Sequence, residues 1–539
     1  MALDNRRDAQ ESAREAFLNS LPERAVLVYP VFVSHKDFLR QIEPLTKRHE
    51  LRKNGATAFH AYRQAEAMVR SANFDFLAPI LSSLYAQDGR PGRDPVPVLR
   101  SLVIMAHLGT ASITEWVYRL NREPLLARLC GLDPEQLPGV GTFYDVLRRI
   151  SGTLPGHSIV MRSLQRPKGV KKGKKAPPRR SGTVGRILDR LRRHPPKLPF
   201  PHWQAVLQGV VRVSQERGLL GTDTRFAVAV DGSPLVSGAN GRGHRICGCK
   251  KTDPCPHIYR RYADPGALVG WDSYRNCFFY GRHLSAVVDT QGGHDLPIYL
   301  RLCQGSRHDS IAGTVAFVGA EQLYPGGFSR FIGDSAFDAL PLYVHLEQHG
   351  TAAVIDLNER DIDTQGQPEK PKRRRFPRAD RKLRERRGRG RRPLAEREGI
   401  HLDLQGHARC REGHALIKRG SSHLGLYTQW RCPLSAHPDL SCQRTCFYRD
   451  HAASLRRDPR LQTRIARGSA AWKAAMDCRT ASERCFSHLK GALRLARGRH
   501  RSDGIWFAHV VIAAITMHVQ AWAGVLDAAF DSKATASAT

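Results

Sequence analysis

The sequence predicts an α/β protein in which a helix-flanked mixed β-sheet follows an all-helical region and is interrupted by an insertion. Three observations carry this prediction. Apolar residues recur at helical spacing before residue 155, strands and helices alternate between 225 and 357, and a basic, cysteine-containing stretch over 361–460 precedes a last helical region. In the central part, directly successive strands give way to strands joined through helices, which requires both antiparallel and parallel pairs.

The composition points to a polyanionic partner. Among 539 residues, 85 Lys and Arg face 50 Asp and Glu, which leaves a formal charge of +35. A hydrophobic fraction of 41% is enough to build cores and excludes wholesale disorder. Self-repulsion at this charge is relieved by binding an anionic polymer, so nucleic acid is the first expectation and an anionic membrane surface the second.

Neither export nor membrane insertion is expected. The 12 cysteines are too few for a secreted disulfide scaffold, and the N-terminus lacks the apolar core of a signal peptide. The apolar stretch 505–526 has nearly the length of a spanning helix, but His509, His518 and Gln520 interrupt it. We therefore expect a buried helix of a cytoplasmic protein and no membrane.

Two basic tracts divide the chain. Residues 166–180 carry eight basic and no acidic residues, and residues 370–392 carry fourteen basic and two acidic ones, a net +12 of the +35. Both are expected to make sequence-independent phosphate contacts, the alternative being a solvated linker. The predicted organisation is a helical DNA-binding domain (1–155), a basic Pro- and Gly-rich linker (156–200), a first core segment (201–360), the insertion (361–460) and a second core segment (461–530).

The helical region begins with apolar spacing after Pro95, which a first helical turn tolerates. Ser112 is expected to cap a second helix, a third ends before Gly131, and Thr142 is expected to cap a fourth that ends in Arg148 and Arg149. Compact helical units that end in a basic helix often place it in a DNA groove. The alternative is a helical oligomerisation or packing module.

The central region reads in the order β, β, β, α, β, α, β. Expected strands cover 225–230, 277–289, 296–303, 328–333 and 351–357, and expected helices cover 310–324 and 338–350.

Two carboxylates follow apolar strands in this region. Asp231 and Asp334 each stand at the expected carboxyl end of a strand, where open α/β sheets place ligands. Paired carboxylates supply the hard oxygen ligands that Mg²⁺ or Mn²⁺ takes. For either residue alone a turn or helix cap explains the Asp equally well. Asp289, before a Gly-Gly turn, and Asp309, at an expected helix start, compete for the role but have such local explanations.

A third carboxylate lies in the last helical region, where one continuous helix is expected around Glu483. Arg479 and Lys490 stand four residues before and seven after it, so all three share a helical face that can hold metal and phosphate together. The alternative is a surface ion pair between Arg479 and Glu483. The expected buried stripe of this helix is Cys478, Cys485, Phe486 and Leu489.

These segments resemble the DDE transposases of bacterial insertion sequences. The resemblance rests on AVAVDGSPL, on FIGDSAFDAL and on CRTASERCFSHLKGALRL. The last of these is similar to the family signature of Tyr, two residues, Arg, three residues, Glu, six residues and Lys. Arg479, Glu483 and Lys490 fit that signature, while Met476 occupies the Tyr position. The helical region before the core is also similar to that family's N-terminal domain.

The resemblance implies an RNase H-like catalytic fold and metal-dependent cleavage and joining of DNA strands at element ends. It implies two Mg²⁺ or Mn²⁺ ions, with Asp231 bridging them and Asp334 and Glu483 each completing one site. Arg479 and Lys490 would bind phosphate. The implied partners are double-stranded DNA, as terminal inverted repeats and target, in a homodimer on paired ends within the bacterial nucleoid. The alternatives are a non-catalytic DNA-binding descendant of a transposase, and a nuclease without strand transfer.

Cysteines outside the core suggest structural zinc. Cys410, Cys432, Cys442 and Cys446 could form a tetrahedral site that fixes a small loop-rich unit lacking its own core. A second set is formed by Cys247, Cys249, Cys255 and His257. Neither set has two C-x2-C pairs, so reduced free thiols are the alternative.

Overall fold

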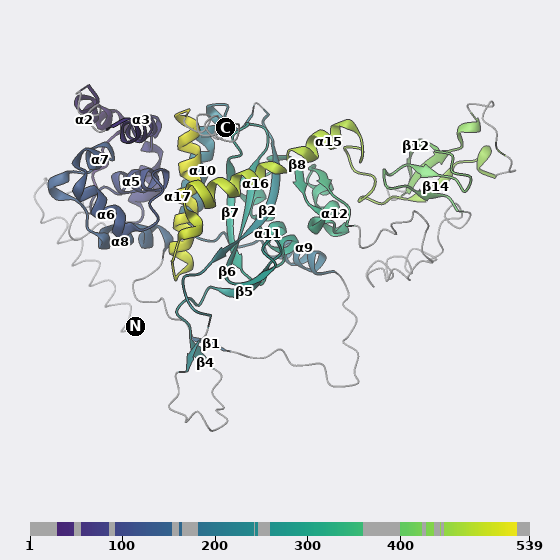
Figure 1. The fold of residues 1–539 in the computed structure, drawn as a ribbon. Coiled ribbons are helices and arrows are strands. Elements are labelled where there is room, and N and C mark those ends of the chain that lie inside the picture. The colour runs from purple at the N-terminus through teal and green to yellow at the C-terminus, as the bar shows by residue number, and fades with distance from the viewer. Residues whose placement is uncertain are drawn as a thin grey trace, which may run out of the picture.

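A computed structural model of the chain shows a central mixed sheet with helices around it (Figure 1). The described residues are 30–47, 55–85, 92–152, 161–163, 182–221, 223–241, 243–245, 259–358, 399–422, 427–435, 442 and 447–524. Both basic tracts and the second cysteine set lie outside them.

The first part of the chain is helical and lies on one side of the sheet (Figure 1). Its α-helices are α2 (His35–Lys47), α3 (Gly55–Ser71), α4 (Ala78–Ser82), α5 (Pro95–His107), α6 (Ile113–Arg122), α7 (Pro124–Leu129) and α8 (Val140–Ser151). Ser112 caps α6 by accepting a hydrogen bond from Glu115 N, as the sequence predicts. The predicted Thr142 cap is wrong, because α8 begins two residues earlier and the carbonyl of Gly139 takes its first N–H groups.

The sheet combines antiparallel and parallel pairs. Its strands are β2 (Phe226–Val236), β5 (Leu268–Asp272), β6 (Cys277–Asp289), β7 (Pro297–Gln304), β8 (Phe328–Gly333) and β9 (Ala352–Ile355). Their order is β5-β6-β2-β8-β9, and β7 also pairs with β6. β2, β6 and β7 are antiparallel neighbours, whereas β8 and β9 run parallel to β2. The predicted mixed sheet is therefore confirmed, with β5 as an added edge strand.

Helices cover both faces of the sheet (Figure 1). They are α9 (Thr183–Arg193), α10 (Pro201–Glu216), α11 (Asp309–Leu323), α12 (Leu340–Gln348), α15 (Ala470–Asp477), α16 (Thr480–Ser487) and α17 (Asp503–Trp522). Val230 lies against Gly313 of α11 on one face. Because side chains alternate along a strand, the next residue, Asp231, points to the other face, where α16 contacts β2 and β6.

The prediction of one continuous helix around Glu483 is wrong, because the helical region is broken into separate segments. α15 ends at Asp477, α16 begins at Thr480, and a π-helical turn, η8 (His488–Ala492), follows before the short 3-10 helix η9 (Leu495–Arg497). Cys485, Phe486 and Leu489 are buried as expected. Cys478 is only half-buried, because it stands at the break between the first two segments.

The described residues between 399 and 456 form a small β unit of their own. It contains the two-stranded pair β10 (His401–Leu402) and β11 (Ala408–Arg409), and the sheet of β12 (Ile417–Ser422), β13 (Tyr427–Arg431) and β14 (Ala453–Arg456). Contrary to expectation the unit has a core of its own, which includes Trp430, Tyr448 and Leu455. Elsewhere β1 (Met161–Ser163), β3 (His244–Arg245) and β4 (Tyr259–Arg261) form another small sheet.

Helix α17 is the predicted buried apolar helix. It is long and apolar enough to cross a membrane, but almost all of it is buried against other parts of the chain. It contacts α5, α8 and α10 as well as β7. It therefore serves as the core helix that joins the helical region to the sheet.

Burial of His518 on this helix predicts acid sensitivity. Its Nε2 donates to the carbonyl of Pro297 at 3.1 Å, so its Nδ1 accepts from the Ser214 hydroxyl at 2.7 Å. Burial lowers the pKa of His518 to about 4. The unfolded chain therefore binds a proton that the folded chain does not, and stability falls as the pH drops from the unfolded value of 6.5 toward 4.

The free energy of unfolding of the wild type should decrease between neutral and acidic pH, and we expect His518→Gln to make that decrease smaller by up to about 3 kcal/mol. Urea denaturation at a series of pH values measures it. His401→Gln, at an exposed histidine, is the control and should follow the wild type. Equal pH profiles for His518→Gln and wild type would contradict the assignment.

Candidate active site

Asp231 and Asp334 lie on neighbouring parallel strands in matching positions. β2 pairs with β8 so that Ala229 is opposite Ile332, and each aspartate stands two residues further along its own chain. Adjacent strands are about 4.8 Å apart, so the two carboxylates share one edge of the sheet. Asp334 also accepts a hydrogen bond from Ala336 N at 3.0 Å, which caps the 3-10 turn after β8. The sheet register thus brings together two residues that are 103 positions apart.

The sequence predicts that the strand ends before Asp231, and this prediction is wrong. β2 continues to Val236 by pairing with β6, whereas its parallel pairing with β8 stops at Ala229. The Gly-Ser-Pro triplet after Asp231 resembles a turn, but the antiparallel partner holds it extended. Asp231 therefore stands at the point where β2 is still paired with β6 but no longer paired with β8.

A further carboxylate joins this edge from α11. Asp309 is the first residue of that helix, as expected, but its Oδ1 also lies 3.1 Å from His283 Nδ1. A Cβ added at Gly232 would come within 2.5 Å of the same oxygen, so a larger residue there would displace the Asp309 carboxylate. The sequence interpretation named Asp309 as a competing carboxylate but explained it by the helix start alone.

The grouping of carboxylates is electrostatically costly. Burial and, to a smaller extent, the charges of Asp309 and Asp334 raise the pKa of Asp231 to about 7, although the backbone hydrogen bond from Gly232 and the charge of Arg479 act in the opposite direction. Burial also raises the pKa of Asp334. Oxygen donors that are desolvated and mutually repulsive fit a hard divalent cation, which would neutralise them.

Glu483 approaches from α16 through an ion pair. Its Oε1 lies 2.7 Å from a guanidinium nitrogen of Arg479, and its side chain is 52% exposed. Arg479 stands at the break between α15 and α16, and its charge lowers the pKa of both Asp231 and Asp334. Arg479 is thus the shared neighbour of the three predicted carboxylates, although their oxygens do not all lie within 4.8 Å of one another.

Lys490 reaches the same strand from the π-helical turn. Its Nζ donates to Ser233 Oγ at 2.5 Å, two residues beyond Asp231. Burial, with a smaller contribution from the charge of Arg275, lowers the pKa of Lys490 to about 8. The two predicted phosphate-binding cations therefore lie beside the predicted carboxylates.

The first predicted zinc set is only partly described. Cys432 belongs to the core of the small β unit, and Cys410 and Cys442 pack against that core. Cys410 Sγ lies 3.5 Å from His414 Nδ1. Cys446 lies outside the described residues, as do all four members of the second set. The three described cysteines thus come from separate parts of the sequence to one small core.

Comparison with known families gives two matches. The family described as Transposase DDE domain matches residues 229–517, which include Asp231, Asp334 and Glu483. The family described as Transposase domain (DUF772) matches residues 49–149, which span α3 to α8. The search of curated proteins found no match.

Proposed function

The chain belongs to the DDE transposases of insertion sequences, and from this we propose that it cleaves DNA at the ends of an element and joins those ends to target DNA. The observation that carries the proposal is the register that sets Asp231 beside Asp334, with Arg479 linking them to Glu483. DNA is the substrate on which this family acts.

The sheet supports an RNase H-like assignment for the core. Three antiparallel strands, β2, β6 and β7, are followed by β8 and β9, which run parallel to β2 on its other side. This arrangement puts the first strand of the core in the middle of the sheet. Side chains from the strands on both sides can therefore lie close to a catalytic residue on that strand, and a site built from several carboxylates requires such neighbours.

Within this proposal Asp231, Asp334 and Glu483 hold divalent metal ions, Mg²⁺ or Mn²⁺. When bound, such ions activate the attacking oxygen and stabilise the leaving oxygen of an in-line phosphodiester displacement. To serve as a ligand, Glu483 would exchange its ion pair with Arg479 for the metal, and the Arg479 guanidinium would then be available to a DNA phosphate. Lys490 offers a second cation on the same side of the carboxylates.

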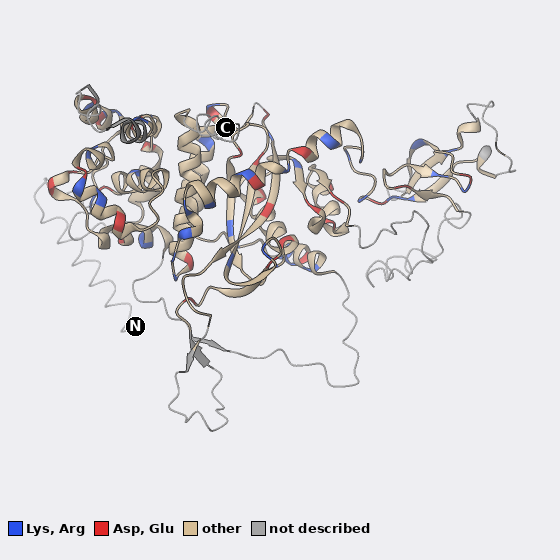
Figure 2. Cartoon of the chain, viewed as in Figure 1, with Lys and Arg blue, Asp and Glu red and all other residues tan. Residues whose placement is uncertain are grey.

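We assign the helical region to binding double-stranded DNA at the element ends, in a homodimer on paired ends. The region 1–155 then acts as the DNA-binding domain, 201–360 and 461–530 as the two core segments, and 156–200 and 361–460 as linker and insertion. In the described helical region basic residues are interspersed with acidic ones (Figure 2). We therefore assign sequence-independent binding of DNA phosphates to the tract 370–392, which has a net positive charge.

The deciding experiment supplies Mg²⁺ and a duplex that carries the inverted repeats flanking the coding region to the purified full-length protein. Cuts at the repeat ends and joined products support the proposal. Binding without cutting would indicate a non-catalytic DNA-binding protein. Cutting without joining would indicate a nuclease.

Lys490 provides a test of phosphate positioning. Lys490→Met is expected to reduce the cleavage rate about 100-fold, because it removes a partly buried cation next to Ser233 and the carboxylates. Lys490→Arg should retain a larger share of the activity. Lys473→Met, at an exposed lysine of α15, is the matched control. Equal rates for Lys490→Met and Lys473→Met would remove Lys490 from the site.

A further inference from the structure

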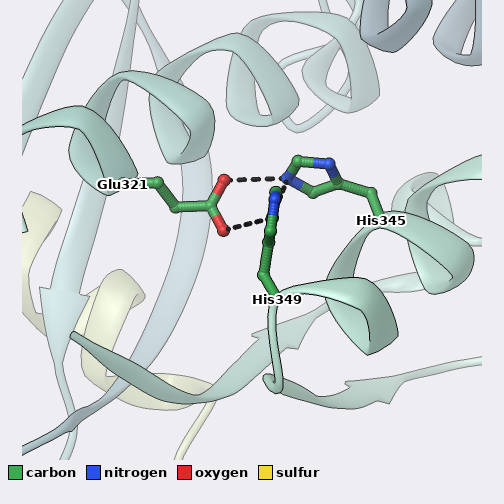
Figure 3. Close-up of side chains that lie close together, drawn as sticks. All are labelled: Glu321, His345 and His349. Atoms are coloured by element: carbon green, nitrogen blue, oxygen red, sulfur yellow. Dashed lines mark hydrogen bonds and ion pairs between the residues drawn. The ribbon is translucent and has the colours of Figure 1, made fainter. Parts of the chain in front are cut away.

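Two histidines and a glutamate converge away from the carboxylate edge. His345 lies on α12, His349 directly follows the end of that helix, and Glu321 faces both from the last turn of α11 (Figure 3). His345 Nε2 lies 2.8 Å from Glu321 Oε2, and His349 Nδ1 lies 3.1 Å from Glu321 Oε1. The two ring nitrogens are themselves 3.1 Å apart. One ligand atom from each of the three residues therefore lies within 4.8 Å of the ligand atoms of the other two.

The spacing of these groups fits a metal ion. Zinc–nitrogen and zinc–oxygen bonds are about 2.0–2.2 Å, so two ligand atoms of a tetrahedral zinc are about 3.3 Å apart. The two ring nitrogens, 3.1 Å apart, are close to that edge length, and each lies 2.8–3.1 Å from a different oxygen of the Glu321 carboxylate. A slight movement that sets one Glu321 oxygen against both nitrogens gives one face of a tetrahedron. His349 is half exposed, which leaves a fourth position open to solvent.

The donor set selects the class of metal. Imidazole nitrogens suit zinc and its neighbours in the transition series, whereas Mg²⁺ takes oxygen ligands and retains its waters. Within the described residues this is the sole group of three or more His, Cys, Asp or Glu whose ligand atoms lie within 4.8 Å of one another. Glu321 stands 12 residues after Asp309 on α11, about 18 Å along the helix axis, so the two sites are separate.

We propose that Glu321, His345 and His349 form a zinc site that ties the end of α11 to the end of α12. The two helices follow β7 and β8, and α9 packs on both. α11 begins with Asp309, and α12 begins six residues after Asp334, so the site joins two helices that start at or shortly after the carboxylate edge. The metal is therefore structural, and the fourth position holds water.

The test is zinc titration of the metal-stripped full-length protein, with Co²⁺ as a spectroscopic probe. Wild type should bind a zinc ion whose affinity falls at least about 100-fold in His349→Ala, since one of three ligands is lost. Zinc should raise the temperature of the thermal transition in wild type and not in this variant. Glu321→Gln is the second variant, because it keeps the shape of the side chain. Gln348→Ala, at the exposed neighbour on α12, is the matched control and should bind as wild type does.

Cysteine-bound zinc must be separated from this site. A background with Cys410→Ser and Cys432→Ser, which removes two thiolates of the small β unit, and with Cys247→Ser and Cys249→Ser, which removes two thiolates of the second predicted set, serves this purpose. In that background Co²⁺ at the proposed site should give a spectrum without thiolate charge-transfer bands, and Mg²⁺ should not displace it. Zinc binding that is unchanged by both His349→Ala and Glu321→Gln would overturn the proposal. Because the readout is metal binding, it does not depend on whether the protein cuts DNA.

Discussion

Asp231→Asn is expected to lower the rate of DNA strand cleavage by at least about 10³-fold while DNA binding is retained. Asn keeps the shape of the side chain and its hydrogen bond with Gly232 N, but it removes the charge that a divalent cation needs. Asp334→Asn and Glu483→Gln should have effects of the same order, because the three residues act as a unit. Cleavage of labelled duplex in Mg²⁺, with binding followed by mobility shift, measures both quantities.

Asp289→Asn is the matched control. Asp289 is also a buried aspartate of the sheet, and burial raises its pKa to about 7 as well. Its Oδ2 accepts from Gln291 N at 3.0 Å and Gly292 N at 2.8 Å, and Asn can preserve this turn. Cleavage should therefore stay near the wild-type rate. A comparable loss in Asp289→Asn and Asp231→Asn would show that the sheet, and not the metal site, had been damaged.

Asp231→Asn should also stabilise the metal-free protein. Because burial and the neighbouring Asp309 and Asp334 disfavour the charged form of Asp231, removing that charge relieves a cost of folding at neutral pH. We expect the thermal transition of Asp231→Asn without Mg²⁺ to lie a few degrees above that of wild type. A more stable but inactive variant would separate loss of chemistry from loss of fold.

Most strands and helices of the core were predictable because they are apolar runs bounded by turn or charged residues, whereas β2 runs past its predicted end at Val230 to Val236. β6 and β8 have the predicted bounds, 277–289 and 328–333, since both are flanked by turn or charged residues. β5 was missed because it is a short edge strand in which Gly270 and an exposed Trp271 interrupt the pattern. The local sequence pattern thus identified the central strands and helices but not the edge strand β5.

The geometry of the candidate site depended on tertiary packing. Helical periodicity cannot show that the chain breaks at Arg479 and forms a π-helical turn that carries Lys490 to Ser233. Likewise, Asp309 reads as an ordinary first-turn acid, and only the approach of α11 to Gly232 puts it among the carboxylates. The three signature residues could be named from spacing, whereas their shared contacts could not.

The largest expected loss of stability comes from a buried ion pair that no sequence pattern indicates. Asp264, on the loop before β5, and Arg282, on β6, are almost fully buried and joined by two hydrogen bonds of 2.6 Å. Arg282 Nε also donates to Asp503 at the start of α17, and Ser237 donates to Asp264. Although burial tends to raise the pKa of Asp264, the hydrogen bonds from Arg282 and Ser237 hold it below its usual value.

Asp264→Ala should therefore lower the free energy of unfolding by about 3–5 kcal/mol, because it leaves the Arg282 guanidinium buried beside a single, half-exposed carboxylate. Denaturant titration measures the loss. Asp189→Ala breaks an ion pair with Arg192 whose side chains are 57% and 73% exposed, and it should cost less than about 1 kcal/mol. In the double variant Asp264→Leu, Arg282→Met no buried charge is orphaned, so it should be more stable than Asp264→Ala. Were the double variant the less stable of the two, the loss would have to be attributed to packing and not to the unpaired charge.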